Sequence, residues 1–139
     1  MHGQTKVIFR IIDANINRAK EGLRVCEEIT RFVINSKSLT ASLKKIRHQI
    51  HLLSGGLANK KSLFAAREAL LDVGKKIYIN ELKRRNLRDV FFANIQRAKE
   101  SVRVLEEFSK LKDTGIAVKF KKIRYCLYEV EKKILQKIS

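Results

Sequence analysis

Asparagine, arginine and glutamate side chains recur at equal spacing in two stretches of this sequence. Residues 13–28 read Asp-Ala-Asn-Ile-Asn-Arg-Ala-Lys-Glu-Gly-Leu-Arg-Val-Cys-Glu-Glu, and residues 93–107 read Ala-Asn-Ile-Gln-Arg-Ala-Lys-Glu-Ser-Val-Arg-Val-Leu-Glu-Glu. The matched pairs are Asn15 and Asn94, Arg18 and Arg97, Glu21 and Glu100, Arg24 and Arg103, Glu27 and Glu106, and Glu28 and Glu107. Arginine pairs bidentately with phosphates, so these residues suit recognition of phosphorylated ligands. Self-similarity of this kind marks a duplicated structural unit.

A helical projection places the repeated polar residues within an apolar face. At about 100° per residue, Asn15 and Arg18 fall among the apolar positions of the first copy, and Asn94 and Arg97 among those of the second. An arginine directed at a core is costly unless it meets a partner or a charged ligand. The pattern therefore predicts buried asparagine and arginine side chains that a pseudo-twofold axis brings to one cavity. The alternative is that Arg18–Glu21 and Arg97–Glu100 are ordinary pairs three residues apart on a helix surface.

Four further residues of this helix, Lys20, Arg24, Glu27 and Arg31, are expected on a solvated face. Cys26 and Cys126 lie far apart in sequence and at apolar helical positions, so both are predicted to be small buried thiols.

The net charge of the chain indicates which classes of partner it can attract. Its 139 residues include 31 Lys and Arg against 14 Asp and Glu, a formal net charge of +17. So basic a chain attracts nucleic acid, an acidic membrane face or phosphorylated small molecules. Residues 1–10 lack a signal-peptide pattern, and no apolar run approaches the ~20 residues that a membrane span needs. These features predict a cytoplasmic protein that does not enter a membrane.

The periodicity predicts an all-α fold. One helix is expected from about residue 11 or 13 to 34, and a second over 39–53 with Ser38 or Thr40 as its cap. Further helices are expected over 86–112 and 116–138, with 1–9 as a short extended or disordered lead-in. Residues 62–71 could form a helix in the connector, and Ile77 and Ile79 a brief extended piece.

Two duplicated hairpins joined by an irregular connector predict a four-helix-bundle-like fold. The chain is interpreted as a single domain, 1–139, with pseudo-repeats over about 11–54 and 88–138 and a connector over 55–87. The second helices also echo each other, because Lys44-Lys-Ile-Arg-His48 matches Lys121-Lys-Ile-Arg-Tyr125. A homo-oligomer such as a dimer is compatible with these long apolar helices.

Two further groups could carry chemistry. Arg67 precedes Asp72-Val73-Gly74, an arrangement in which the arginine could hold a phosphate and Asp72 a Mg²⁺ ion, or which could simply punctuate a helix. His48 and Tyr125, which follow the matched Arg47 and Arg124, could stack on a flat heterocycle. His48 and His51 are spaced for a metal, but no third ligand is evident nearby.

The stretches 10–25, 43–48, 67–74 and 93–107 together resemble the alternative bacterial hydroxymethylpyrimidine phosphate kinase family, which is found alone or fused ahead of thiamine phosphate synthase. The resemblance implies phosphorylation of 4-amino-5-hydroxymethyl-2-methylpyrimidine phosphate to its diphosphate by ATP and Mg²⁺ in thiamine biosynthesis. The synthase barrel does not form part of this sequence, so synthase activity is not expected. One departure is Glu68-Ala69, where the family has Asp-Thr before its Asp-x-Gly.

Under this reading each candidate residue has an expected role. Arg18 and Arg97, with Arg47, Arg67, Arg124 and Gly74, would grip the substrate phosphate and the nucleotide tail. Asn15, Asn94 and His48 would contact the aminopyrimidine or its hydroxymethyl group. Asp72, Glu21 or Glu100 would hold Mg²⁺ or orient that hydroxyl.

Two other classes of protein remain open. A basic, all-helical nucleic-acid-binding module would explain the charge, although no helix-turn-helix spacing and no aromatic residues interleaved with a basic stripe support it. A helical enzyme of mutase type would use paired arginines to grip carboxylates. Salt-sensitive RNA or DNA binding without ATP turnover would favour the first, and a panel of dicarboxylates and pyrimidine phosphates would separate the second from a kinase.

Overall fold

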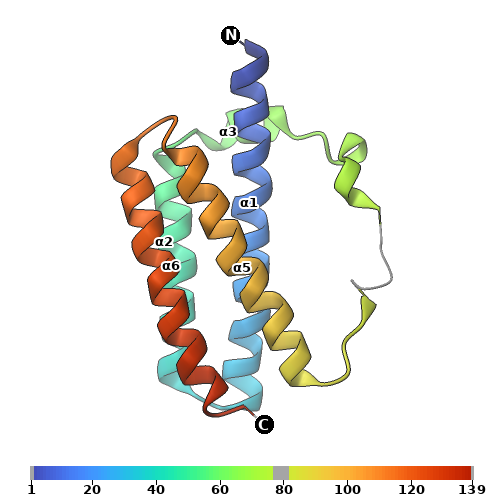
Figure 1. Ribbon diagram of the computed structural model, residues 1–139, viewed down its shortest axis with the longest axis vertical. Helices are drawn as coiled ribbons and strands as arrows, with labels where there is room; N and C mark the ends of the chain where they lie inside the picture. The colour runs from blue at the N-terminus through green and yellow to red at the C-terminus, as the bar shows by residue number, and fades with distance from the viewer. Residues whose placement is uncertain (1, 77–81, 139) are drawn as a thin grey trace.

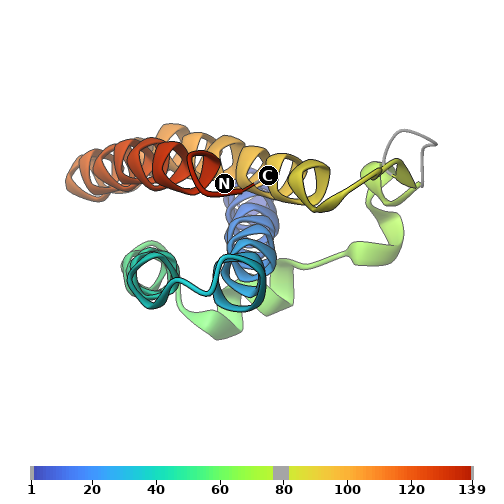
Figure 2. The same cartoon turned by 90° about the horizontal axis from the view of Figure 1, so that it is seen from below.

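The computed structural model describes residues 2–76 and 82–138, and these residues form helices and loops with no strand. Four long helices pack in a ring: α1 (His2–Glu28) against α2 (Lys37–Gly55) and α5 (Leu87–Ser109), and α6 (Thr114–Leu135) against α5 and α2. The hairpins α1–α2 and α5–α6 form two layers (Figure 1, Figure 2). The predicted all-α bundle is confirmed.

The connector begins with a short helix, α3 (Lys60–Ala66), that packs on α1. It continues through the 3₁₀ turns η2 (Ala69–Leu71) and η3 (Val73–Lys75) along the side of the bundle away from α2 and α6 (Figure 1). The predicted helix over 62–71 is therefore split at Arg67 and Glu68, whose backbones are extended or irregular. Ile77 and Ile79 lie outside the described residues.

The repeat pairs the core positions of the two halves. Ile16, Ala19, Leu23 and Cys26 are buried on α1, and their counterparts Ile95, Ala98, Val102 and Leu105 are buried on α5. Because both helices direct the same stripe inward, the α1–α5 seam is a pseudo-symmetric packing of one motif against its copy. Within it Gly22 lies so close to α5 that a Cβ would meet the Asn94 carbonyl oxygen at 2.7 Å.

Helix ends follow local side-chain chemistry. The side chain of Ser36 caps α2 by accepting from the Leu39 amide at 3.2 Å, so the predicted caps Ser38 and Thr40 are wrong; the Thr40 hydroxyl instead donates to the Ser36 carbonyl at 2.7 Å. α1 leads into a π-helical turn, η1 (Ile29–Val33), after which Asn35 takes a left-handed conformation with φ of 57°. This is the break expected at Asn35-Ser36.

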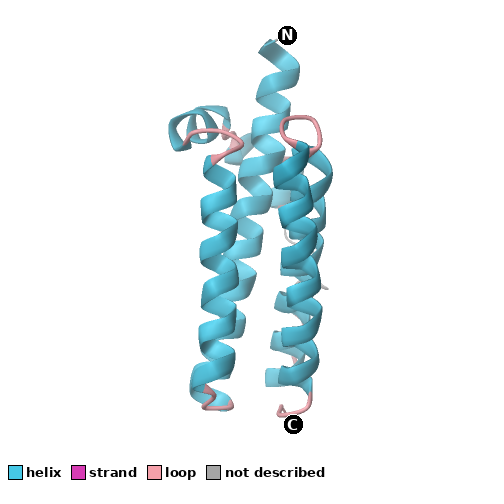
Figure 3. Ribbon diagram, turned by 90° about the vertical axis from the view of Figure 1, so that its left-hand side faces the viewer, coloured by secondary structure: helices cyan, strands magenta, loops and turns pink. Residues whose placement is uncertain are grey.

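The lead-in predicted over 1–9 is wrong for the described residues, because α1 begins at His2 and its first turns project beyond the bundle (Figure 3). Ile8 and Phe9 pack against the core, and the Lys112 ammonium lies 4.8 Å from the centre of the Phe9 ring. These contacts stabilise helix where sequence alone showed only a weakly patterned segment. Within the described residues, no helix combines the length and the apolar character that a membrane span requires.

Candidate functional site

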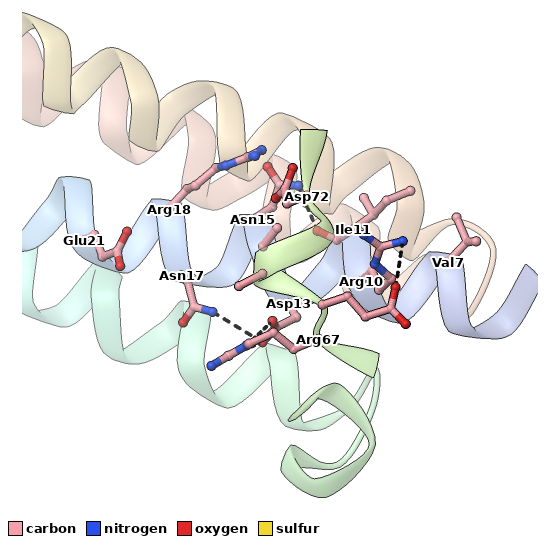
Figure 4. Close-up of a pocket in the computed structure, with 13 residues that line it drawn as sticks. Val7, Arg10, Ile11, Asp13, Asn15, Asn17, Arg18, Glu21, Arg67 and Asp72 are labelled. Carbon is pink, nitrogen blue, oxygen red and sulfur yellow. Dashed lines mark hydrogen bonds and ion pairs between the residues drawn. The ribbon is translucent and has the colours of Figure 1, made fainter. Parts of the chain in front are cut away.

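A first cavity, about 730 Å³, lies where the connector crosses α1. Its charged lining consists of three arginines, Arg10, Arg18 and Arg67, and four carboxylates, Asp13, Glu21, Glu68 and Asp72. Figure 4 shows the α1 side chains and Asp72 gathered around this first cavity. It is a polar site with nearly balanced charge.

Arg67 fastens the connector to α1. Its Nε donates to Asp13 Oδ2 at 2.8 Å and its Nη2 to Asp13 Oδ1 at 2.7 Å, while Asn17 donates to the same Oδ1 at 3.3 Å (Figure 4). Asp13 is buried, and the hydrogen bonds to it raise the pKa of the Arg67 guanidinium above its usual value. A bidentate pair of this kind fixes geometry, so Arg67 holds one wall of the first cavity in place.

Glu68 makes the second attachment. Its carboxylate accepts from Lys6 Nζ at 2.6 Å and lies 3.6 Å from Arg10 Nη1, and the bond from Lys6 lowers the pKa of Glu68. Glu68 ties the connector to the first turns of α1.

A second cavity, about 450 Å³, lies between α1 and α5 and shares Asn15 and Arg18 with the first. Arg97, Glu100, Gln96 and Ser101 line it from α5. Arg18 and Arg97, which occupy matching positions of the repeat, thus reach the same cavity, as the pseudo-twofold axis requires.

The predicted burial holds for only part of this set. Asn15 is buried and Asn94 half-buried, but Arg18 and Arg97 are both exposed. The aliphatic part of a long arginine side chain can pack on apolar residues while its guanidinium group remains in solvent. The asparagine amides donate to their own helices, Asn15 to the Ile11 carbonyl and Asn94 to the Val90 carbonyl, each at 2.8 Å.

The guanidinium groups of Arg18 and Arg97 have no ion-pair or hydrogen-bond partner anywhere in residues 2–76 and 82–138. The alternative of ordinary Arg18–Glu21 and Arg97–Glu100 pairs is therefore wrong. Glu100 instead accepts from Gln96 Nε2 at 3.0 Å. Two unpartnered guanidinium groups facing one cavity have the donors to bind an anion.

The other duplicated arginines are already paired. Arg47 donates to Glu27 through Nε at 2.6 Å and Nη2 at 3.1 Å, and Arg124 donates to Glu106 through Nε at 3.0 Å. Both glutamates are buried, so the solvated face expected for Glu27 is wrong: an arginine from the neighbouring helix reaches it. These bonds raise the pKa of both guanidinium groups. Each of the two matched pairs joins the two helices of its hairpin.

A third cavity, also about 450 Å³, continues from the second across α5 to α6. The two share Gln96, Glu100 and Val104, and the third adds Lys99, Arg103, Arg124 and Tyr128. Arg124 reaches the Tyr128 hydroxyl at 3.1 Å. Of the arginines expected to grip phosphate, Arg124 therefore lines this cavity, whereas Arg47 lines none of the three.

The other candidates are dispersed. Asp72 is half-buried in the first cavity, where its Oδ1 accepts from the Gly74 amide at 2.7 Å. Gly74, His48 and Asn94 line none of the three cavities. The described chain contains no group of three or more His, Cys, Asp or Glu placed to hold a metal ion.

Sequence reasoning missed several lining residues, namely Asp13, Gln96, Ser101, Arg103 and Tyr128. Gln96, Ser101 and Arg103 lie inside the duplicated motif, so their place in the repeat was a usable signal. Asp13 and Tyr128 gave no such signal, because Phe92 and His51 stand at their matching positions.

Comparison with known proteins identifies the lineage. The profile of the ThiD2 family matches residues 10–133. The chain belongs to the ThiD2 family. This family member is 37% identical over 131 residues to a thiamine-phosphate synthase of Nostoc punctiforme, covering 94% of this chain and 36% of that protein. It is 37% identical over 129 residues to the thiamine-phosphate synthase of Synechocystis sp. (92% of this chain and 36% of that protein) and 34% identical over 139 residues to that of Rhodopirellula baltica (99% and 37%).

The ThiD2 chain therefore spans about a third of the length of these relatives. The resemblance inferred from the duplicated motif is confirmed at the level of the family. No solved structure matches the chain.

Proposed function

We propose that this protein is a kinase of thiamine biosynthesis that transfers the terminal phosphate of ATP to 4-amino-5-hydroxymethyl-2-methylpyrimidine phosphate, giving the diphosphate. Membership of the ThiD2 family and similarity to thiamine-phosphate synthases support a role in this pathway. The observation that carries the proposal is the pair of unpartnered arginines, Arg18 and Arg97, on one cavity that opens into a second polar cavity.

The chemistry of this transfer asks chiefly for cations. An oxygen of the substrate phosphate bonds to the γ-phosphorus of ATP, the bond from that phosphorus to the β–γ bridging oxygen breaks, and ADP leaves. Two anionic groups must therefore approach each other, and catalysis depends on alignment and on positive groups where charge gathers. Arg18 lines both of the joined cavities and Arg97 faces it, so they stand where both phosphates can be contacted.

The choice of substrate revises one expectation about the carboxylates. The hydroxymethyl oxygen of this substrate already carries a phosphate, so no hydroxyl has to be oriented or deprotonated. Glu21 and Asp72 are then available to accept hydrogen bonds from the amino group of the pyrimidine or, for Asp72, to bind a cation. Asn15 lines both cavities, and its amide nitrogen donates to its own helix, so its side-chain oxygen would be the atom that accepts from the substrate.

The first cavity fits a Mg²⁺ ion that brings most of its own ligands. Mg²⁺ in kinases is usually held by one or two carboxylates together with substrate phosphates and water. Asp72 has Oδ2 remaining after Oδ1 accepts from Gly74, and Glu21 has no partner in the described chain. Asp72 would hold the ion, which would neutralise phosphate charge.

The test is an assay of purified protein with ATP, Mg²⁺ and the pyrimidine phosphate, with ADP and the diphosphate detected by ³¹P NMR. Arg18→Gln and Arg97→Gln are each expected to lower kcat on the order of a thousandfold, as loss of an arginine at a transferring phosphoryl group does. Arg24→Gln is the matched control, because Arg24 is an exposed α1 arginine that lines none of the three cavities.

Folded Arg18 and Arg97 variants with near-wild-type kcat would show that these arginines do not act on the phosphates. A wild-type protein that makes no diphosphate but binds RNA in a salt-sensitive manner would replace the kinase with the nucleic-acid-binding alternative.

A further inference from the structure

The three cavities adjoin one another in a fixed order, and together they are called the groove. The first and second share Asn15 and Arg18, and the second and third share Gln96, Glu100 and Val104. The first and third share no lining residue. Two ligands that must react with each other would therefore meet at Arg18, one on each side of it.

The two sides of Arg18 differ in charge. The first cavity sets four carboxylates against three arginines. Besides Arg18, the residues that line the second and third cavities include four cationic residues and a single carboxylate, that of Glu100. Glu106 and Glu131 pair with three of these four cations from outside the lining. A nucleoside triphosphate carries about four negative charges and favours the more positive side, since like charges disfavour each other strongly where water is partly excluded.

Several of the cations in the third cavity are held in position from outside it. Lys99 donates to Glu131 at 2.9 and 3.0 Å, and Arg103 donates to Glu106 through Nη1 at 3.1 Å. These bonds use only some of the donors of an ammonium or a guanidinium group. The cations are thus placed in advance with further N–H groups left for an anion.

The shape of the groove agrees with the charge. Arg97 and Arg103 are six residues apart on α5, about 9 Å along the helix axis. A nucleoside triphosphate, with its polyphosphate, sugar and base, is long enough to span that distance. The third cavity also offers the ring of Tyr128, packed edge-on against Tyr125 with centroids 5.6 Å apart, while the residues that line the first cavity include no aromatic side chain.

We infer that the nucleotide lies along α5, with its base end in the third cavity beside Tyr128 and its terminal phosphate between Arg97 and Arg18. The pyrimidine phosphate occupies the first cavity, where its phosphate also reaches Arg18. This placement rests on the proposed function, and it makes Arg103 and Tyr128 nucleotide-binding residues.

A pair of repeat-matched variants tests the placement. Arg103→Gln and Arg24→Gln remove arginines of similar exposure, each paired with a glutamate three residues on, but only Arg103 lines the groove. Titration calorimetry with a non-hydrolysable ATP analogue and Mg²⁺ is expected to show about tenfold weaker binding for Arg103→Gln, consistent with loss of one charge-assisted contact. Arg24→Gln should bind the analogue as the wild type does, and both variants should keep the wild-type affinity for the pyrimidine phosphate.

A second measurement needs no variant. Photolabelling of the wild-type protein with an ATP that carries an azide on its adenine, followed by mass spectrometry, should modify peptides that contain residues 99–104 or Tyr128. Labelling of residues 7–21 or 67–72 would overturn the placement, as would equal analogue affinity in the two arginine variants. A wild-type protein that binds neither reactant would contradict the proposed function as well. Normal turnover together with labelling of residues 7–21 or 67–72 would contradict only the placement of the nucleotide.

Discussion

Duplicated charged residues in this protein serve two different purposes. Arg47 and Arg124 are matched to Glu27 and Glu106, and each pair joins neighbouring helices from a buried carboxylate. Arg18 and Arg97 have no such partner in the described chain and face a cavity. Removing one member of a buried pair leaves an uncompensated charge, so the first set is retained for structure. The second set has no side-chain partner that would explain it, which is why we propose that it binds phosphate.

Asp72 offers a residue-scale test of metal binding. Asp72→Asn preserves size and the hydrogen bond to Gly74 but removes a charge. If Asp72 binds Mg²⁺, the Mg²⁺ concentration for half-maximal turnover should rise about tenfold or more, because charged oxygen ligands dominate Mg²⁺ affinity. Steady-state rates measured over a Mg²⁺ titration check this. An unchanged midpoint would take Asp72 out of the metal's ligand set.

The two cysteines differ in environment, and sequence reasoning anticipated only one of them. Cys26 is buried, whereas Cys126 is exposed, so the predicted burial of Cys126 is wrong. Burial, aided by the charges of Glu131 and Glu27, raises the pKa of Cys26 from 9.0 to about 12. The folded chain then keeps its proton where the unfolded chain loses it, so this thiol's contribution to stability is complete below pH 9 and is lost as the pH rises toward 12.

This difference predicts the reactivity of the thiols. With a disulfide reagent at about pH 8, one thiol per chain should react in the native protein and two in denaturant, because only an accessible thiolate attacks. A Cys126→Ser variant, which should show no native reactivity, is the control. Two reactive thiols in the native wild type would contradict the buried position of Cys26.

At the residue scale, the sequence was informative where the two copies agree. The duplication predicted that Arg18 and Arg97 would reach one cavity, and they do. It could not predict their exposure, because a helical projection places Cα atoms and ignores the reach of a long side chain. The Arg67–Asp13 pair could not be predicted from the sequence either, because the two residues are 54 positions apart and meet only through the path of an irregular connector.

At the scale of elements, helix type and order could be predicted from apolar periodicity, but the boundaries depend on caps and tertiary contacts. The N-terminal part of α1 is held by Ile8 and Phe9, which pack against the core, and by Lys6, which pairs with the connector. α2 starts at Lys37 because Ser36 caps it. The crossing of α1 and α5 is set by Gly22, whose missing side chain admits the Asn94 carbonyl. Ser101, at the matching place in α5, folds its hydroxyl back onto the Arg97 carbonyl at 2.7 Å.

Gly22 therefore tests the crossing. Alanine is favoured over glycine inside a helix by up to about 1 kcal/mol, but here its Cβ would overlap a backbone oxygen. Gly22→Ala is expected to lower the free energy of unfolding by about 1–3 kcal/mol, the usual cost of overpacking. Gly22→Leu should cost more and also reduce turnover, because separating α1 from α5 opens the second cavity.

Gly3→Ala is the control, because Gly3 lies in the same helix with no atom within 4 Å of an added Cβ. It should be neutral or slightly stabilising in urea unfolding. A Gly22→Ala protein as stable as the wild type would mean that the two helices can move apart without loss.

For the whole molecule, the pseudo-symmetry is broken by the connector. The same motif lines both sides of the α1–α5 seam, yet the connector covers α1 through Asp13, and Phe92 stands at the matching position of α5. A symmetric scaffold thereby acquires two unlike ends, one with balanced charge and one with excess positive charge. Two unlike phosphorylated reactants suit such a groove.

The net charge of +17 then gives a whole-molecule prediction. Screening shortens the reach of charge from about 10 Å at 0.1 M salt to about 3 Å at 1 M, so both reactants should bind more weakly as NaCl is added. The KM for ATP should rise more steeply than the KM for the pyrimidine phosphate, because ATP carries more charge and lies on the more positive side of the groove. Steady-state kinetics across a salt series, with one reactant saturating in turn, give the salt dependence of each KM.

The control is a pair of variants. Arg24→Gln changes the net charge by the same amount as Arg103→Gln, so only Arg103→Gln should reduce the salt dependence of the KM for ATP. An equal reduction by both would mean that the general field of the protein attracts ATP, without a specific contact from Arg103.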